Sequence, residues 1–307
     1  MKIQTILGAG GVIGKELAKI LPRYTEQVRL VSRHPEKINA SDEIFTADLN
    51  NLSQVEEAVK GSEVIYLTAG LPYNIKIWQE QWPRIMQNSI LACKKYGAKL
   101  IFFDNIYIYG KVNGPITENT PYHPCSKKGK VRLQLTQMLT EAWNKGDITG
   151  AIVRSADFYG PGADNAPFNL LVLDKLRQHQ KAQWICRDNV RYSMTFTPDA
   201  ASGTALIGNT ADAVNQVWHL PASSESVTAG DLIKLSAEIA GASAKHILLK
   251  KPMISLTGLF NRNVREMKEM LYQYEHDYIF DSGKFEKRFN VKAATYKEGI
   301  IRILQEQ

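Results

Sequence analysis

Cysteine is scarce in this sequence, with three residues in 307 at positions 93, 125 and 186. An odd number of cysteines without a Cys-x-x-Cys pair argues against a disulfide framework and against a structural metal site. Long apolar runs are also missing, because no stretch reaches the length of about 18 residues that spans a bilayer. The first residues lack a signal-peptide pattern. We therefore expect a cytoplasmic protein with no metal and no membrane partner.

Acidic residues are in the minority, since 31 Asp and Glu oppose 38 Lys and Arg, for a formal net charge of +7 at pH 7. The basic residues are spread along the chain and accompany no recognised nucleic-acid motif, so we expect no nucleic acid partner. A modest positive field instead favours anionic cofactors and phosphorylated or nucleotide-linked small-molecule substrates. The expected assembly is a monomer or a homodimer.

Glycine is concentrated where the chain leaves its first apolar run. Residues 3–7 are followed by Gly8, Gly11 and Gly14, with Gly10 as an extra, and then by apolar residues at helical spacing. Glycines in a strand–turn–helix context allow a tight turn, approach of the backbone to a pyrophosphate, and close packing of helix on strand. The N–H groups at the helix start then face the phosphates. This pattern predicts a dinucleotide site.

Strand and helix patterns alternate through the first half of the chain, which is typical of a parallel sheet with helices on both faces. We predict an α/β fold, a Rossmann-like doubly wound parallel sheet with a smaller C-terminal α/β substrate-capping domain. The expected dinucleotide-binding domain comprises 1–163 and 187–220, and the expected substrate-binding domain comprises 164–186 and 221–307. The strands are expected at 3–7, 28–31, 43–46, 63–67, 99–103 and 148–154, and the two long helices at 76–96 and 126–144.

Several segments together resemble the extended branch of the short-chain dehydrogenase/reductase superfamily, which includes NAD-dependent epimerases and dehydratases. These are the G-x-x-G-x-x-G turn, the Tyr-Gly at 109–110, the segment 153–162 that ends in Tyr-Gly-Pro-Gly, and the segment 191–201. The resemblance implies that Asp48 contacts the adenine and that residues 68–70 lie beside the cofactor. The expected cofactor-binding residues are Gly8, Gly10, Gly11, Val12, Ile13, Gly14, Ser32, Arg33, Asp48, Leu49, Thr68, Ala69, Gly70, Asn105, Arg132 and Ser155.

The end of the second strand indicates which nicotinamide cofactor is preferred. A carboxylate there accepts hydrogen bonds from the free ribose of NAD, whereas an arginine accommodates the 2′-phosphate of NADP. The chain has Ser32 and Arg33, and no carboxylate until Glu36. We expect NADP(H) to be preferred, with NAD(H) as the second choice; the alternative interpretation of Arg33 is a solvent-facing loop residue.

The family's proton-transfer residues are replaced. A literal Tyr-x-x-x-Lys match, Tyr107 with Lys111, is interrupted by Gly110, so no helix brings the two side chains to one face. At the family's positions stand Lys128 for the tyrosine, Arg132 for the lysine and Asn105 for the serine or threonine.

Two hypotheses follow from these replacements. In the first, the protein is an enzyme in which Lys128 donates the proton, Asn105 polarises a carbonyl and Arg132 holds ribose hydroxyls, with a phenol of Tyr107 or Tyr159 as the alternative acid. In the second, it is a catalytically silent NADP(H)-binding sensor or scaffold.

The expected substrate is a carbonyl compound or a sugar nucleotide, whose identity the sequence does not name. A salt bridge within the second domain is the alternative for Arg191, and Trp184 and Phe168 are expected in the core. The candidate substrate residues are Tyr73, Asn74, Asp157, Tyr159 and Arg191.

Overall fold

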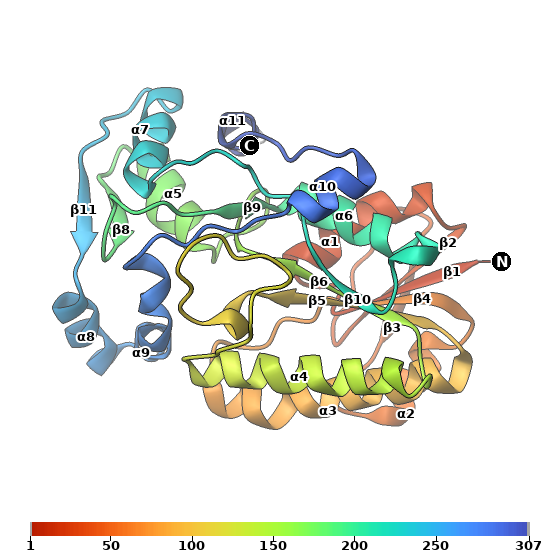
Figure 1. Cartoon of the computed structure of the whole chain (residues 1–307). Helices are drawn as coiled ribbons and strands as arrows, with labels where there is room; N and C mark the ends of the chain where they lie inside the picture. Colours follow the sequence, from red (N-terminus) through yellow and green to blue (C-terminus); the bar gives the residue numbers. More distant parts are fainter. Residues whose placement is uncertain (1, 306–307) are drawn as a thin grey trace.

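A parallel seven-stranded sheet forms the centre of the computed structural model, which describes residues 2–305 (Figure 1). The strands lie in the order β10-β6-β5-β4-β1-β2-β3, and all neighbouring pairs are parallel. The reversal of strand order beside β1 is the doubly wound arrangement, so the predicted fold class is confirmed. The bounds are β1 Ile3–Leu7, β2 Gln27–Ser32, β3 Glu43–Thr46, β4 Ser62–Leu67, β5 Lys99–Asn105, β6 Gly150–Ser155 and β10 Gln216–His219.

Helices cover both faces of this sheet (Figure 1). One face packs against α2 (Leu52–Val59), α3 (Ile75–Tyr96) and α4 (Lys127–Asn144), and the other against α1 (Val12–Ile20), α6 (Thr197–Gly208) and α10 (Gly283–Phe289). The two long helices begin and end within one residue of the predicted positions. Local chemistry fixes these ends: Ser126 accepts a hydrogen bond from the backbone of Gly129, and Gly97 ends α3 in the left-handed conformation.

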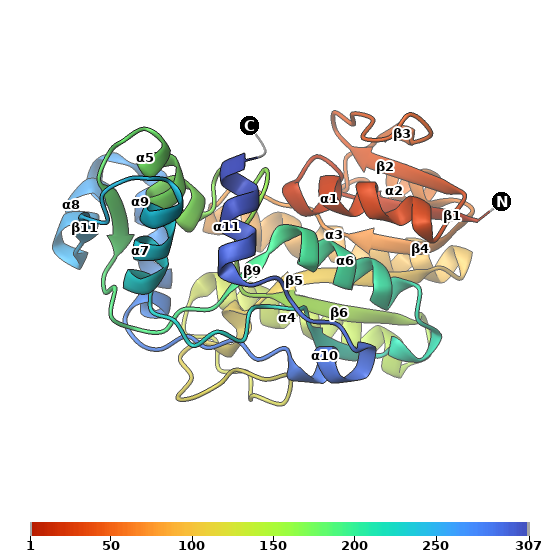
Figure 2. The same ribbon diagram turned by 90° about the horizontal axis from the view of Figure 1, so that it is seen from above.

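A smaller group of elements lies beside the carboxyl ends of the strands, and we call it the cap (Figure 2). Two parallel strands, β8 and β11, pair in the cap, and a short second ladder joins β7 (Asp157–Tyr159) to β9 (Met194–Phe196). The cap comprises η3 (Asn169–Leu173), α5 (Asp174–Arg177), β8 (Ala182–Ile185), α7 (Ala229–Ile239), β11 (His246–Leu249), α8 (Lys251–Phe260), α9 (Arg262–Met267), η5 (Lys268–Tyr274) and α11 (Tyr296–Gln305).

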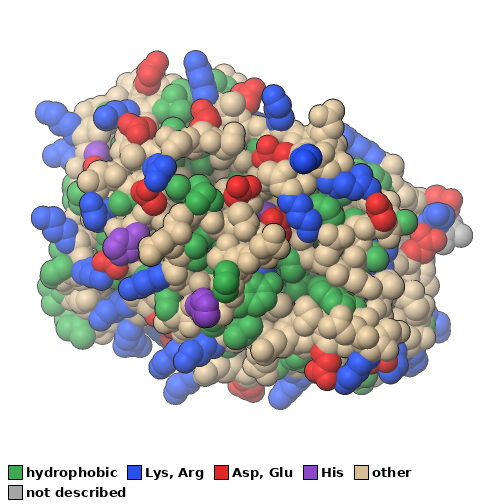
Figure 3. All heavy atoms as spheres, in the orientation of Figure 1, with side chains coloured by type: hydrophobic (Ala, Val, Ile, Leu, Met, Phe, Trp, Pro, Cys, Tyr) green, Lys and Arg blue, Asp and Glu red, His purple; other side chains and the backbone are tan. Residues whose placement is uncertain are grey.

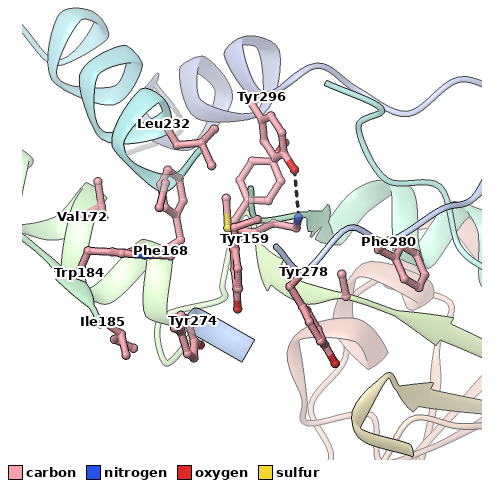
Figure 4. Close-up of a cluster of buried hydrophobic side chains, with 14 of the residues drawn as sticks. Tyr159, Phe168, Val172, Trp184, Ile185, Leu232, Tyr274, Tyr278, Phe280 and Tyr296 are labelled. Atoms are coloured by element: carbon pink, nitrogen blue, oxygen red, sulfur yellow. Dashed lines mark hydrogen bonds between the residues drawn. The ribbon is translucent and has the colours of Figure 1, made fainter. Parts of the chain in front are cut away.

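The core of the cap is aromatic (Figure 4). Phe168 and Trp184 are each 1% exposed and contact edge to face, as expected of core residues. Tyr159 packs against Phe168 and Tyr296, and the hydroxyl of Tyr296 accepts a hydrogen bond from the backbone N–H of Met194. This interlocked core holds the cap as one body over the sheet.

One helix of the C-terminal segment lies with the sheet rather than with the cap. The ring of Phe285 on α10 meets Trp218 of β10 at 6.1 Å between centroids. The chain therefore returns to the sheet after building most of the cap. None of the helices between residues 2 and 305 combines the length and apolar character that crossing a bilayer requires.

Candidate functional site

The glycine turn joins β1 to α1 as the sequence predicts. Gly8 has φ +98°, and a Cβ there would lie 2.3 Å from the Cα of Ala69, so the position accepts only glycine. A Cβ on Gly14 would lie 2.8 Å from the Cα of Ala9, which lets α1 pack closely on the turn. By contrast, a Cβ on Gly10 would contact nothing within 4 Å, and one on Gly11 nothing within 3.5 Å. The turn therefore leaves open space where a pyrophosphate would approach the start of α1.

The end of β2 lies directly beside this turn. The backbone N–H of Gly8 donates to Val31, two residues before Arg33. Arg33 is exposed, and the hydroxyl of Ser32 accepts a hydrogen bond from the backbone of residue 34. Asp48 is exposed; hydrogen bonds from Asn50 lower the pKa of its carboxyl, and the charge of Arg33 adds to this effect. Ser32, Arg33 and Asp48 therefore lie close together beside the glycine turn.

A single pocket of about 780 Å³ connects the glycine turn with the carboxyl ends of β4, β5 and β6. It is lined at one end by Gly10 and Gly11 and at the other by Asn105, Tyr107 and Arg132. Further predicted residues on its wall are Val12, Ile13, Thr68, Ala69, Gly70, Tyr73 and Asp157. Predicted site residues from distant parts of the sequence thus line the same pocket.

Tyr107 begins a short 3-10 turn, Tyr107–Tyr109, directly after β5. Gly110 ends this turn with φ +65°, so Lys111 follows on no helix, as the sequence indicated. The Tyr107 ring stacks on Trp78 at 6.5 Å, and the Asn105 side chain accepts a hydrogen bond from the Tyr107 backbone. Burial raises the pKa of Tyr107, and the nearby Asp157 adds to the shift. The phenol is therefore protonated at neutral pH.

Lys128 is fully buried at the start of α4 and does not line the pocket. Its Nζ donates to Glu266 and to Glu269, each at 2.8 Å, and lies 4.4 Å from the centre of the Tyr73 ring. Although burial opposes it, the hydrogen bond from Lys128 lowers the pKa of the Glu266 carboxyl. Two carboxylates thus lie at hydrogen-bond distance from the ammonium group. Lys128 is held by two residues of the cap, Glu266 and Glu269, which we call the clamp.

The same two glutamates also bind helix starts. Glu266 accepts a hydrogen bond from the backbone N–H of Ile75, and Glu269 accepts one from that of Lys127. Carboxylates are favoured there because the first N–H groups of a helix lack partners within it. The segment from α9 to η5 therefore fastens the cap to α3 and α4 at once.

Arg132 lies one turn further along α4 and does reach the pocket. Its guanidinium is held between the rings of Trp78 and Trp82, 4.6 and 4.2 Å from their centres. Its Nε lies 3.6 Å from Asp104, and Nε and Nη1 have no hydrogen-bond partner among the described residues. A buried guanidinium with unused donors is a candidate for binding ligand hydroxyls.

Asp104 is shared between two arginines. Its second oxygen accepts a hydrogen bond at 3.2 Å from Arg154, which is fully buried and also donates to Tyr109, Tyr122 and Thr136. Tyr109 in turn bonds His219 at 2.7 Å. This network lies behind the part of the pocket that Asp104 lines, and it holds Asp104 beside Arg132.

Asp157 contributes a carboxyl to the pocket wall from β7. One of its oxygens accepts hydrogen bonds from the hydroxyls of Tyr192 and Tyr274. Burial raises the pKa of Asp157, although these two hydrogen bonds oppose the shift. The carboxyl therefore joins β7 to Tyr192 and Tyr274 beside the pocket.

Ten other candidates are absent from the pocket lining. Six of them lie at the glycine turn or at or just after the ends of β2 and β3: Gly8, Gly14, Ser32, Arg33, Asp48 and Leu49. Four lie elsewhere. Arg191 is exposed and forms an ion pair with Asp277, the arrangement given as its alternative. Tyr159 is buried in the aromatic core of the cap. Asn74 caps α3, and Ser155 donates to the carbonyl of the next residue. In this structure each of the four makes structural contacts.

Sequence reasoning missed the residues that surround Arg132 and Lys128. Trp78 and Trp82 stand four residues apart, which places both rings on one face of α3. This spacing could have indicated two aromatic rings that contact a planar cation such as a guanidinium. Glu266 and Glu269 gave no such signal, because their contacts with Lys128 span 138 and 141 residues.

The residues present fit a nicotinamide dinucleotide. The open space over Gly10 and Gly11 suits a pyrophosphate, and the unused donors of Arg132 suit ribose hydroxyls. Residues 2–305 contain no group of three or more His, Cys, Asp or Glu side chains placed to hold a metal ion.

Three solved structures with the same architecture are named as epimerases of UDP-sugars. UDP-glucuronic acid 4-epimerase from Bacillus cereus, solved with NAD, is 19% identical with a TM-score of 0.81, covering 100% of this chain and 99% of its own. UDP-glucose 4-epimerase from Thermotoga maritima, solved with UDP-glucose, is 17% identical with a TM-score of 0.80, covering 99% and 98%. That from Thermus thermophilus, solved with NAD, is 15% identical with a TM-score of 0.79 and the same coverage. At these identities the likeness establishes the fold.

The comparison with curated proteins gave no match. The comparison with protein families matches residues 5–218, which include the glycine turn, the Tyr-Gly segment, Lys128 and Arg132. This match covers more than half of the 307 residues and agrees with the resemblance inferred from the motifs. The chain belongs to the NAD-dependent epimerase/dehydratase family.

Proposed function

We propose that the protein is an oxidoreductase that binds NADP(H) and reduces a keto group in a sugar-nucleotide-type small molecule. The observation that carries this proposal is that the glycine turn, Asn105, Tyr107 and Arg132 line the same pocket. The UDP-sugars named for the similar structures support a nucleotide-linked substrate. Ser32 and Arg33 at the end of β2 support the preference for the 2′-phosphate.

The cofactor supplies a hydride to the substrate carbon when it is bound. Arg132 would hold the nicotinamide ribose through its unused Nε and Nη1 donors, in place of the family's lysine. Trp78 and Trp82 fix the plane of its guanidinium, so these donors are oriented before binding. Arg132 thus takes a positioning role with no titratable proton at neutral pH.

Proton donation falls to Tyr107 in this proposal, rather than to Lys128. Tyr107 lines the pocket and is protonated at neutral pH, so it can donate to the carbonyl oxygen as hydride reaches the carbon. Lys128 is engaged by two carboxylates outside the pocket lining. A protonated phenol favours reduction of a carbonyl over abstraction of an alcohol proton, which an epimerase needs in its first step.

The test is hydride transfer from NADPH deuterated at C4 to a panel of keto-sugar nucleotides and small ketones, followed by mass spectrometry. Deuterium in a reduced product is the expected result. Epimerised product without net reduction would contradict the proposed reaction but retain the family's chemistry.

The second candidate is an NADP(H)-binding sensor without catalysis. The clamp on Lys128 favours it, because the family's proton-transfer position is occupied by a structural contact between sheet and cap. Tight NADPH binding with no deuterium transfer to any member of the panel would support this candidate.

A further inference from the structure

The outer end of the cap carries a group of exposed apolar side chains on α8. In Figure 3, hydrophobic and basic side chains lie together at the lower left, where Figure 1 places α8. The group comprises Met253, Leu256, Leu259 and Phe260, which are 47%, 63%, 68% and 88% exposed; we call it the α8 patch. Clustered apolar exposure of this kind marks an interaction surface, whereas isolated apolar residues do not.

The exposure is not a sign of a loosely held helix. Ile254, on the opposite side of α8, is 4% exposed and belongs to the cap core. Gly258 is buried, and a Cβ there would lie 3.3 Å from the Cα of Arg265 on α9. α8 therefore packs closely on α9 along one side and presents the α8 patch outward along the other.

Basic residues surround the α8 patch. Residues 250–275 contain five basic and three acidic side chains. The acidic ones face inward or are neutralised, since Glu266 and Glu269 bind Lys128 and Glu275 binds Lys251. Apart from Lys251, which pairs with Glu275, the exposed basic residues here are Lys250 before α8, Arg262 and Arg265 on α9, and Lys268 at the start of η5.

We propose that the α8 patch docks the protein on the surface of a membrane that contains anionic lipid. Apolar side chains between cations match the two layers of such a surface, acyl chains beneath negatively charged headgroups. A second copy of the chain fits less well, because a two-fold contact through the α8 patch brings the same basic residues against each other. Such docking lays α8 in the plane of the interface, so it requires no transmembrane segment. This departs from the expectation of no membrane partner, which rested on the absence of apolar runs.

The experiment is co-sedimentation of the full chain with vesicles of phosphatidylcholine containing about 50% phosphatidylserine, compared with pure phosphatidylcholine. We expect binding to the anionic vesicles only. About 0.5 M NaCl should release the protein, because salt screens charges at the headgroups. The double variant Leu256→Glu/Phe260→Glu should lower the apparent partition coefficient at least about tenfold.

The matched control is Ile44→Glu/Leu91→Glu, which adds the same charge at exposed apolar positions on β3 and α3. It should bind vesicles about as well as the unmodified protein. Absence of binding to anionic vesicles, or equal losses in the two double variants, would overturn the proposal. A concentration-dependent dimer that only the Leu256→Glu/Phe260→Glu variant abolishes, without vesicle binding, would overturn it in favour of a second copy.

Discussion

The two ends of the pocket follow the family pattern to different degrees. At the glycine turn the full pattern is kept, and Gly8 and Gly14 occupy positions where a Cβ would come within 3 Å of the neighbouring backbone. At the start of α4, Lys128 and Arg132 stand where the resemblance leads us to expect a tyrosine and a lysine. The first end works through backbone shape and N–H groups, whereas the second works through individual side chains. The glycine turn thus keeps the family pattern, whereas the residues at the start of α4 differ from the expected pair.

At the start of α4, several side chains hold Lys128 and Arg132 in place. Lys128 is held by two glutamates of the cap, and Arg132 by two tryptophans and by Asp104, which Arg154 fixes from behind. A buried charge costs free energy unless it has partners. Several buried charges are placed here, each with partners. We infer that fixing the side chains at this end of the pocket offsets the free-energy cost of burying these charges. The five predictions below test the comparison between the two ends.

The largest expected effect is on proton donation. Tyr107→Phe removes the phenol and keeps the ring stacked on Trp78, so we expect turnover on a reduced substrate to fall about 10²–10⁴-fold. NADPH affinity, measured by fluorescence titration, should change little. Tyr24→Phe, at an exposed site on the surface, is the control. Full activity in Tyr107→Phe together with inactive Lys128→Met would return the acid role to Lys128.

Lys128→Met should act on stability. Removing one partner of a buried ion pair leaves Glu266 and Glu269 without their cation, and we expect a loss of about 3 kcal/mol in the free energy of unfolding. Urea unfolding measures it. Glu269→Gln and the double variant complete a cycle, in which coupling between the two sites should be clear. Additive effects would show that the clamp contributes no coupling.

At the glycine turn, Gly11→Val fills the space left open above the start of α1. We expect NADPH affinity to fall at least about 100-fold while the unfolding midpoint changes little. Ala40→Val, at an exposed position outside the pocket lining, is the control. If Gly11→Val binds NADPH as tightly as the control does, the open space is not a phosphate site.

His219 makes the network behind Arg132 sensitive to acid. Burial lowers the pKa of His219 from 6.5 to about 3. The unfolded chain therefore binds one more proton between these values, and stability is lost as the pH falls below about 6.5. From pH 7 to pH 5 this amounts to about 2 kcal/mol. In His219→Gln the loss over that interval should be smaller by this amount; equal losses in urea titrations would show that the imidazole is not buried neutral.

The smallest effect concerns the cofactor's 2′-phosphate. If Ser32 and Arg33 bind it, NADP(H) should bind at least about tenfold more tightly than NAD(H), and Arg33→Ala should remove most of the difference. Arg23→Ala is the control, since that arginine ends the short helix after α1. Equal affinities in the unmodified protein would favour NAD(H), the cofactor named for the similar structures.

The sequence predicted the fold well because the relevant signals are local. Apolar runs, the cap of Ser126 and the left-handed Gly97 place strands and helices within one or two residues. The site was predicted in part, because strand ends meet at one edge of the sheet. What sequence reasoning could not supply is the surroundings of Lys128, whose glutamate partners lie 138 and 141 residues away. Likewise, nothing in the sequence distinguished Tyr159, which is in the core, from Tyr107, which is on the pocket wall.

The return of the chain to the sheet has a consequence for synthesis on the ribosome. Strands β1 to β6 are complete once residue 155 has emerged, but the edge strand β10 follows some 60 residues later. The loop after β5 waits longer still, because the N–H of Ile116 bonds the carbonyl of Ile279. A nascent chain therefore presents a finished glycine turn well before this loop has its final partners.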